Sequence, residues 1–548
     1  MSVTEALTPA SARLVAAAAA AALLLTGLGA TDFWAPDEPR YGAIAEELRE
    51  QRNGAVDWIV LRLNGKTYSQ KPPLYFWLAA LAGAPAHRVS EVAARLPSAL
   101  AGVAVVWLAI GFGSRRLGPW TGVAAGIILL TAWEFAFLAR RAQLDVLLTL
   151  WITLALVWFW RCQREPKDKR GPVIVHVAMG LAVLTKGPVG WLLPALIILA
   201  YLAWEGRLRE LPGWFRPSAL VWSLGPGLIW FAAATAVAPP GYFEAAVVEN
   251  LFGRFFAGTS HARPAYYYLY QFPILFLPWT PLWILAASVG RKRVFANDAE
   301  PERARVWRFL LCWVGVPLLF FSLAGGKRGV YMLPAFPATA LLCADAVSDW
   351  LARRDAIPRS VSTALFALAA AVAIGGILAP WIGESWGVEI PWLVGFGTAL
   401  IAAGAVFSWH LARRASAPTA LQIGLIGCAV FFTEWLCFSG YLPALNIEKS
   451  PRPIAEAAAE LTHGAELVGL VSERALVGGI TYYGNRQVAE LSDPDSIARF
   501  LQNGGRVLVV AERKLERVES VASAQIQARA RSGRRTLLVV TAEGADGD

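Results

Sequence analysis

The chain has 548 residues, of which 56% are hydrophobic and 16% are charged, and its formal net charge is +10. Soluble globular proteins carry about 25% charged and about 45–50% apolar residues, and a single soluble core stops growing near about 250–300 residues. The surplus of apolar side chains therefore faces lipid, which excludes a soluble enzyme, a nucleic-acid-binding protein and a disordered protein.

Thirteen apolar runs follow one another along the chain, and a membrane-spanning helix needs about 20 such residues. The first run covers 14–30, and we interpret it as an uncleaved helix because the basic segment that begins a signal peptide is almost absent. We therefore expect an α-helical integral membrane protein with about 13 transmembrane helices. The remaining runs centre near residues 104, 128, 151, 179, 196, 228, 281, 316, 340, 370, 401 and 431.

Basic residues give the expected chain an orientation. If the N-terminus is cytoplasmic, every short connection on the inner side carries Lys or Arg, for example 115–116, 161–170 and 291–308. Cytoplasmic loops show such an excess. An odd number of spans then places the C-terminus outside. The sequence thus predicts a multi-pass membrane protein with its N-terminus in the cytoplasm and its C-terminus on the outer side.

Several expected outer connections are also basic, against this rule. Snorkelling at a helix end explains any one such residue, but several loops of one sign indicate a shared anionic ligand. A lipid phosphate fits, because Arg and Lys bind phosphate through charge-assisted hydrogen bonds. The residues concerned are Arg40, Lys71, Arg140, Arg141, Lys186, Arg254, Arg263, Lys327 and Arg328.

Two domains are expected. The first is a transmembrane domain of residues 1–442, with long outer loops at about 31–90 and 239–270. The second, residues 443–548, alternates short apolar strands near 467–471, 507–510 and 536–540 with helical patterns such as 495–501. This alternation predicts a small α/β domain, which the expected topology places on the outer side of the membrane.

The first outer loop carries the densest set of polar residues. Asp37 and Glu38 lie between the first membrane helix and a new amphipathic helix, where they either cap that helix or act as a general base or metal ligand. Lys71 precedes two prolines and an apolar stretch, 74–85, that is too short to span the membrane. We expect that stretch to lie as a helix in the membrane interface.

These motifs together resemble the bacterial protein-mannosyltransferase-like superfamily of GT-C glycosyltransferases, and the resemblance covers essentially the whole chain. They are most like those of the enzymes that transfer 4-amino-4-deoxy-L-arabinose to lipid A. The motifs that carry it are Asp37-Glu38-x-Arg40-Tyr41, Lys71-Pro72-Pro73-Leu74, Arg95-Leu96-Pro97-Ser98, Arg140-Arg141 followed by Asp145, and Leu184-Thr185-Lys186-Gly187-Pro188.

The resemblance implies a protein of the cell inner membrane whose C-terminal domain lies in the periplasm. It also implies catalysis on the periplasmic side by inversion, with a polyprenyl-phosphate-linked sugar as donor. Asp37 is the first choice to accept the acceptor's proton, and Glu38 the second, as its partner or a metal ligand. If the acceptor is itself a phosphate, Asp37 instead orients the reactants. The donor phosphate would be bound by Lys71, Arg254, Arg263, Lys327, Arg328 and Tyr331. The substrate pocket would include Arg40, Tyr41, Tyr68, Gln70, Tyr75, Asp145 and Lys186.

The expected function is therefore transfer of a sugar from undecaprenyl phosphate to an envelope acceptor, with aminoarabinose and a lipid A phosphate as the leading pair. Alternatives are a protein O-mannosyltransferase or another lipopolysaccharide sugar transferase and, from another class, a polyprenyl-phosphate lipid transporter. No cofactor is expected to be required. His261 leaves a divalent metal ion open as an alternative, although a lone His is usually structural.

Overall fold

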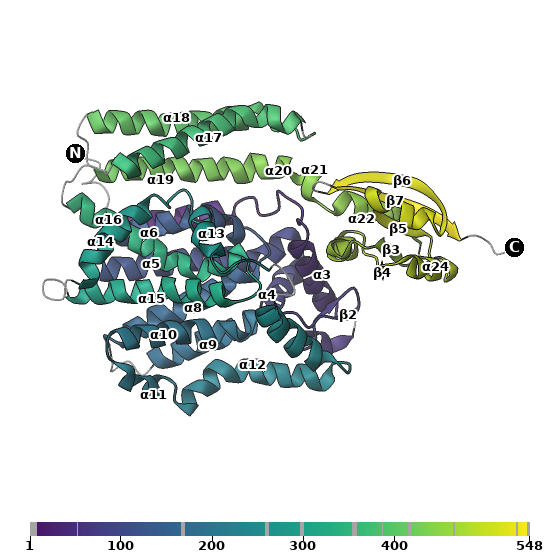
Figure 1. Ribbon diagram of the computed structural model, residues 1–548, viewed down its shortest axis with the longest axis horizontal. Coiled ribbons are helices and arrows are strands. Elements are labelled where there is room, and N and C mark those ends of the chain that lie inside the picture. Colours follow the sequence, from purple (N-terminus) through teal and green to yellow (C-terminus); the bar gives the residue numbers. More distant parts are fainter. Residues whose placement is uncertain are drawn as a thin grey trace.

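The computed structural model describes residues 8–51, 53–165, 170–257, 262–295, 301–352, 359–385, 387–414, 419–463, 466–532 and 535–544. Long helices make up most of these residues, and a sheet lies at one end of the helical bundle (Figure 1).

Each expected apolar run coincides with a helix. Seven described helices are long and apolar enough to cross a membrane, or eight if a bent pair is one span, and five more apolar helices are shorter. The number thirteen stays a prediction. The helices on the runs are α2 (Pro9–Leu25), α5 (Glu91–Arg116), α6 (Pro119–Leu130), α8 (Leu144–Cys162), α9 (Gly171–Lys186), α10 (Val189–Trp204), α12 (Pro217–Val237), α14 (Leu282–Phe295), α15 (Pro301–Leu323), α16 (Phe336–Ala352), α17 (Arg359–Ser385), α18 (Trp392–Arg414) and α19 (Thr419–Leu436).

Three of the runs are interrupted. The run near 128 continues from α6 into α7 (Trp133–Ala139) through a bend of 69°. The run near 281 is divided between α13 (Tyr267–Leu275) and α14, where prolines at 278 and 281 remove backbone donors. The run near 340 begins as the 3₁₀ segment η5 (Gly329–Ala335) and continues as α16.

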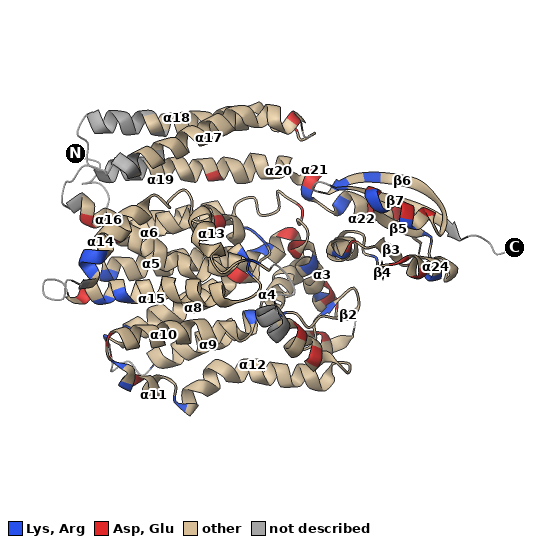
Figure 2. Ribbon diagram, in the orientation of Figure 1, with Lys and Arg blue, Asp and Glu red and all other residues tan. Residues whose placement is uncertain are grey.

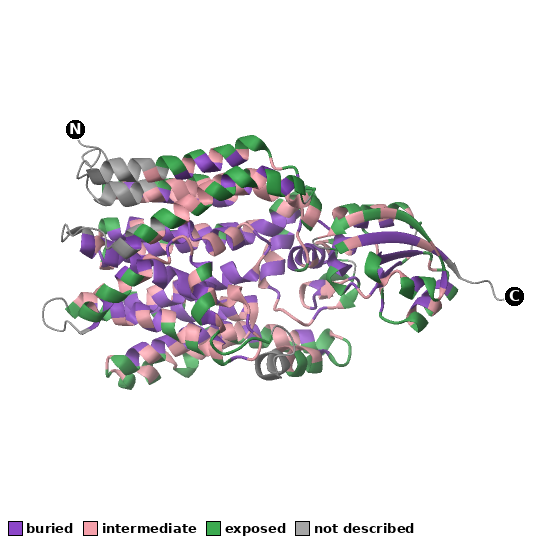
Figure 3. Ribbon diagram, turned by 45° about the horizontal axis from the view of Figure 1, so that its top comes forward, coloured by how far each residue is buried: buried purple, intermediate pink, exposed green. Residues whose placement is uncertain are grey.

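The bundle has three parts. Helices α17, α18 and α19 form a layer along one side, and α9, α10 and α12 lie along the opposite side (Figure 1). Buried residues concentrate between these layers (Figure 3). The outer layers expose large apolar side chains, such as Ile229 at 72% and Leu393 at 84%. Exposed apolar surface of this extent is stable in lipid rather than in water, as the composition predicted.

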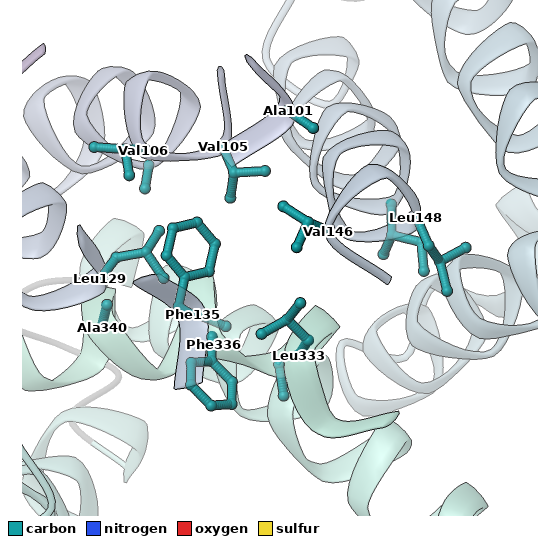
Figure 4. Close-up of a cluster of buried hydrophobic side chains, with 14 of the residues drawn as sticks. Ala101, Val105, Val106, Leu129, Phe135, Val146, Leu148, Leu333, Phe336 and Ala340 are labelled. Carbon is teal, nitrogen blue, oxygen red and sulfur yellow. The ribbon is translucent and has the colours of Figure 1, made fainter. Parts of the chain in front are cut away.

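The core lies where α5, α6, α7, α8 and α16 meet (Figure 4). Small residues permit close packing there. A Cβ atom at Gly102 of α5 would lie 2.9 Å from the Cβ atom of Ala139. The segments that carry the polar motifs are attached to the ends of these core helices.

Shorter elements fill the long segment between α2 and α5 and the connections between the other helices. The apolar stretch 74–85 forms a short helix, as expected. The elements are α3 (Asp37–Glu50), η1 (Gly54–Trp58), β1 (Arg62–Leu63), β2 (Lys66–Thr67), α4 (Leu74–Gly83), η2 (Ala84–Ala86), η3 (Leu208–Glu210), α11 (Leu211–Trp214) and the π-helix η4 (Glu244–Ala257).

The C-terminal part is a five-stranded mixed sheet with helices, in the strand order β4-β3-β5-β7-β6. The small α/β unit is therefore confirmed. The segments η6 (Cys437–Tyr441) and α20 (Leu442–Ala444) continue the span of α19. The elements of the α/β unit are α21 (Asn446–Lys449), α22 (Arg452–Glu460), β3 (Val468–Val471), η7 (Arg474–Leu476), α23 (Val477–Tyr483), β4 (Val488–Leu491), α24 (Pro494–Gln502), β5 (Val507–Ala511), η8 (Glu512–Lys514), α25 (Glu516–Glu519), β6 (Ala522–Ser532) and β7 (Arg535–Gly544).

Candidate active site

The two adjacent carboxylates begin helix α3. Asp37 and Glu38 occupy its first turn, where the partial positive charge of a helix N-terminus stabilises anions. Neither side chain caps the helix by a hydrogen bond to its first amides. Both are buried, at 7% and 3% exposure, so their charges are compensated by other groups.

Asp37 lies between two arginines. Its Oδ1 accepts a hydrogen bond from Arg40, one turn along α3, and its Oδ2 accepts one from Nη2 of Arg328 at 2.9 Å. Burial acts to raise the pKa of Asp37, but the charges of Arg40 and Arg328, together with Lys71, outweigh it and hold that pKa below its ordinary value. Asp37 is therefore a stable carboxylate that joins the segment between α2 and α5 to the loop before η5.

Glu38 is enclosed by five hydrogen-bond donors. The Nε and Nη2 atoms of Arg95 lie 2.8 and 3.0 Å from its two oxygens, and Arg141 also contacts Oε2. The backbone amides of Trp34 and Ala142 donate at 3.1 and 2.9 Å. Burial would raise the pKa of Glu38, but Arg141 and Arg95 hold it at about 2. Its oxygens are fully occupied by the protein itself.

Arg95 fastens the loop before α3 to the bundle. Besides Glu38, its guanidinium donates to the carbonyls of Leu28, Thr31 and Asp32 at 2.6–2.7 Å. Only 1% of Arg95 is exposed. The acidic pair is therefore positioned by a buried charge from α5.

A second ion pair joins the ends of two core helices beside Asp37. Lys186, the last residue of α9, donates to Asp145 in the first turn of α8. The Lys186 ammonium also lies 4.5 Å from the centre of the Tyr331 ring. Asp145 helps to raise the pKa of Arg328. Asp145, Lys186 and Tyr331 thus form one polar cluster with Asp37 and Arg328.

The other expected pocket residues fall into two groups. Tyr41, Tyr68 and Tyr75 are buried, and the Tyr75 hydroxyl donates to the carbonyl of Ala94 at 2.6 Å. Gln70 and Lys71 are half-buried, and Lys71 is close enough to Asp37 to lower its pKa. The tyrosines therefore line the inner side of the cluster, and Gln70 and Lys71 lie where it meets solvent.

The remaining phosphate-binding candidates lie in two connected loops. The Lys327 ammonium is buried and donates to the carbonyls of Ala324 and Arg263, the latter at 3.0 Å. Ala262 and Gly326 form a β-bridge beside it. Lys327 thus joins the loop before α13 to the loop before η5, and the Arg263 side chain is exposed. Arg254 lies in η4, where only the backbone is described.

Metal binding has little support among the described residues. No group of three or more His, Cys, Asp or Glu side chains there is arranged to hold a metal ion. His261, the residue suggested as a ligand, lies outside the described residues.

The C-terminal unit holds the acidic loop from the other side. Asn446 accepts hydrogen bonds from the Asp32 amide and the Trp34 indole at 3.0 and 3.1 Å. The Tyr483 hydroxyl accepts one from the Phe33 amide at 2.7 Å. These residues were not predicted, because nothing local marks them. They act only through the fold, some 400 residues from the loop that they contact.

Comparison with known proteins assigns the fold to a class. ArnT from Cupriavidus metallidurans, in a crystal structure with undecaprenyl phosphate, covers 97% of this chain and 98% of its own, with a TM-score of 0.78 and 20% identity. An oligosaccharyltransferase from Archaeoglobus fulgidus covers 94% and 72%, with a TM-score of 0.51 and 14% identity. The chain has the fold of these membrane proteins, and the expected GT-C fold class is confirmed.

Comparisons of the amino-acid sequence show which proteins of this fold the chain resembles. Residues 70–233 match a family model described as dolichyl-phosphate-mannose-protein mannosyltransferase. An undecaprenyl phosphate-α-4-amino-4-deoxy-L-arabinose arabinosyl transferase of Pseudomonas savastanoi is 34% identical over 60% of this chain and 59% of that protein. One from Aeromonas salmonicida is 30% identical over 58% and 57%. The chain thus matches less than two thirds of these relatives' length, and the expected resemblance to the aminoarabinose transferases is confirmed.

Proposed function

We propose that this protein is an inverting glycosyltransferase that moves a sugar from undecaprenyl phosphate to an acceptor in the cell envelope. The leading substrates are 4-amino-4-deoxy-L-arabinose and a phosphate of lipid A. The names of the curated relatives and the fold of a protein that binds undecaprenyl phosphate support this choice. We place the site and the C-terminal domain in the periplasm and the N-terminus in the cytoplasm.

The observation that carries the proposal is the position of Asp37 between Arg40 and Arg328, with Lys71 nearby. Each arginine has five N–H donors in a fixed fork, and Asp37 takes only part of them. The carboxylate therefore orients two guanidinium groups whose remaining donors match phosphate oxygens. Two phosphates meet in the proposed reaction, one in the donor and one in the acceptor.

The proposed reaction is a direct displacement. An ionised phosphate oxygen of the acceptor attacks the anomeric carbon of the sugar on the face opposite the polyprenyl phosphate. The new carbon–oxygen bond forms as the old one breaks, and the bonding electrons leave with the polyprenyl phosphate. Lys71, Arg40 and Arg328 stabilise the charge that develops on the leaving group, as preorganised cations do.

Asp37 orients these cations in the proposed reaction. An ionised phosphate needs no base, and a carboxylate whose pKa is lowered is a poor proton acceptor. Of the two roles expected for Asp37, its surroundings favour orientation over proton transfer. We assign Glu38 a positioning role, because five donors already occupy its oxygens. No step requires a cofactor or is assigned to a metal ion.

The Lys186–Asp145 pair and Tyr331 complete the proposed substrate pocket. The polar atoms of these residues lie beside the two arginines that pair with Asp37, and in this position they can bind the sugar. Lys327 contributes through the loop that it ties, because its ammonium already donates to two carbonyls. Arg254 and Arg263 remain proposed contacts of the donor phosphate from the loop before α13.

A transfer assay with the purified full-length protein tests the proposal. Radiolabelled undecaprenyl-phosphate aminoarabinose is supplied with lipid A, and the labelled product is separated by chromatography. We expect product formation that Lys71→Ala reduces by about 100-fold or more. Transfer to a protein, or transfer of another sugar alone, would select a different member of the superfamily. Movement of the lipid across a vesicle membrane without any product would support the transporter instead.

A further inference from the structure

An apolar groove, separate from the polar cluster around Asp37, runs along the bundle toward its other end. Helices α14, α15 and α16 enclose a groove of about 450 Å³. Its walls are almost entirely hydrocarbon and aromatic, with Trp283 and Ala287 from α14, Trp307 and Leu318 from α15, and Leu342 from α16. No part of the proposed reaction uses it.

The length of the groove matches one leaflet of a bilayer. Its lining extends along α14 from Trp283 to Val294 and along α15 from Trp307 to Leu318. Each interval is eleven residues, or about 16 Å at 1.5 Å per residue. Half of the hydrocarbon core of a membrane is about 15 Å. The groove therefore has the length of a lipid acyl chain in a single leaflet.

A cation lies at the membrane-surface end of this groove. Arg291 lines it, Lys292 follows, and both side chains are exposed. Their neighbours are already neutralised, since Arg293 pairs with Asp349 and Arg303 with Asp345. Within the described residues, no carboxylate pairs with Arg291 or Lys292. Figure 2 shows the basic residues gathered at this end of α14.

We propose that this groove binds an anionic phospholipid of the membrane leaflet remote from the active site. One acyl chain lies between α14 and α15, and the phosphate is bound by Arg291 with Lys292. Trp204, which also lines the groove and is 48% exposed, lies beside the headgroup at the interface, where tryptophan is favoured. An apolar groove that ends in positive charge, with no carboxylate paired to it among the described residues, matches the two halves of such a lipid.

Native mass spectrometry of the purified, delipidated full-length protein tests this inference. Phosphatidylglycerol and phosphatidylcholine with identical acyl chains are titrated in turn. We expect one phosphatidylglycerol to be retained with at least tenfold preference. Arg291→Gln should weaken its binding about fivefold, the contribution of one basic residue near a charged membrane surface. Ala287→Phe, which fills the exposed wall of the groove, should reduce retention of both lipids.

Matched controls separate this site from general effects of charge and size. Arg216→Gln removes an exposed arginine before α12, and Ala232→Phe enlarges an exposed alanine within it; neither should alter binding. Elution volume and melting temperature identify variants that fail to fold, and Arg291→Gln alone decides if Ala287→Phe does not fold. Equal retention of the two lipids, or equal loss in Arg291→Gln and Arg216→Gln, would overturn the proposal.

Discussion

Asp37 and Glu38 are neighbours in the chain, but their side chains point in different directions. Successive residues of a helix point about 100° apart, so Asp37 is directed at the polar cluster and Glu38 into the protein. The sequence predicted the importance of the pair and left its two roles open. Hydrogen-bond donors distinguish the two residues. The donors to Glu38 come from α5 and from the connection between α7 and α8, and only the fold brings them to this carboxylate.

Asp37→Asn should reduce transfer without unfolding the protein. The amide keeps the shape of the side chain but loses the charge that orients Arg40 and Arg328, and small misplacements of binding groups cost about 100-fold in rate. We expect kcat to fall by about that factor. The melting temperature should change little, because both arginines are partly exposed and water can solvate them. Glu50→Gln on the same helix is the control, and equal loss in both variants would contradict this role.

Glu38→Gln should instead destabilise the fold. It leaves Arg95 and Arg141 buried without a counter-charge, which costs about 3–5 kcal/mol. Thermal unfolding of both proteins in the same detergent measures the difference. An unchanged melting temperature would show that other groups neutralise the two arginines.

The same residue predicts a pH dependence. Folding lowers the pKa of Glu38 from about 4.5 to about 2. The stability linked to this shift is present above pH 4.5 and is lost as the pH falls toward 2. The melting temperature of the unmodified protein should therefore fall between pH 5 and 2, and that of Glu38→Gln should fall less. Parallel curves for the two proteins would assign acid sensitivity to other groups.

Helices and strands with a clear periodicity of apolar residues were predictable from the sequence, whereas breaks within the apolar runs were less so. The apolar runs gave the long helices, and the apolar strands β3, β5 and β7 were expected. Strand β4 was missed because its four residues, Val488–Leu491, mix apolar and polar side chains, whereas the four residues of β3 are all buried. Strand β6 alternates small and polar residues over Ala522–Ser532, a two-residue period that would have identified it. The bend between α6 and α7 depends on tertiary packing and has no marker in that sequence.

The contact between α21, α23 and the loop before α3 predicts that the C-terminal unit affects catalysis. Asn446→Ala removes three hydrogen bonds to Asp32 and Trp34, and Tyr483→Phe removes the acceptor of the Phe33 amide. A looser loop holds Asp37 and its arginines less accurately. We expect each variant to lower kcat about tenfold with a smaller change in the donor KM.

A matched substitution tests whether this effect is specific. Asn503 is an exposed residue after α24, on the same unit and away from the loop. Asn503→Ala should keep full turnover. If Asn446→Ala and Tyr483→Phe matched it in kcat, the unit would be an independent domain without influence on the active site.

Across the whole molecule, charge separates into two ends with a nearly uncharged middle (Figure 2). One end carries the basic residues of α14 and α15, many of them paired with acids. The other end carries the C-terminal sheet and the polar cluster around Asp37. The sequence predicted this separation because loop charges can be counted along the chain. The sequence could not show which basic residue contacts Asp37, because Arg328 lies almost 300 residues away and contacts Asp37 only in the folded bundle.

The orientation of these two ends is testable by cysteine labelling in intact cells. In a background with the five native cysteines replaced, Asn503→Cys marks the C-terminal unit and Arg216→Cys marks the connection before α12. A charged maleimide does not cross the inner membrane, so in cells with a permeable outer membrane it should label position 503. It should label position 216 only after detergent is added. The basic connections underlie this expectation, because Lys and Arg are retained on the cytoplasmic side. The reverse labelling pattern would place the polar cluster around Asp37 in the cytoplasm, where the proposed transfer to an envelope acceptor could not occur.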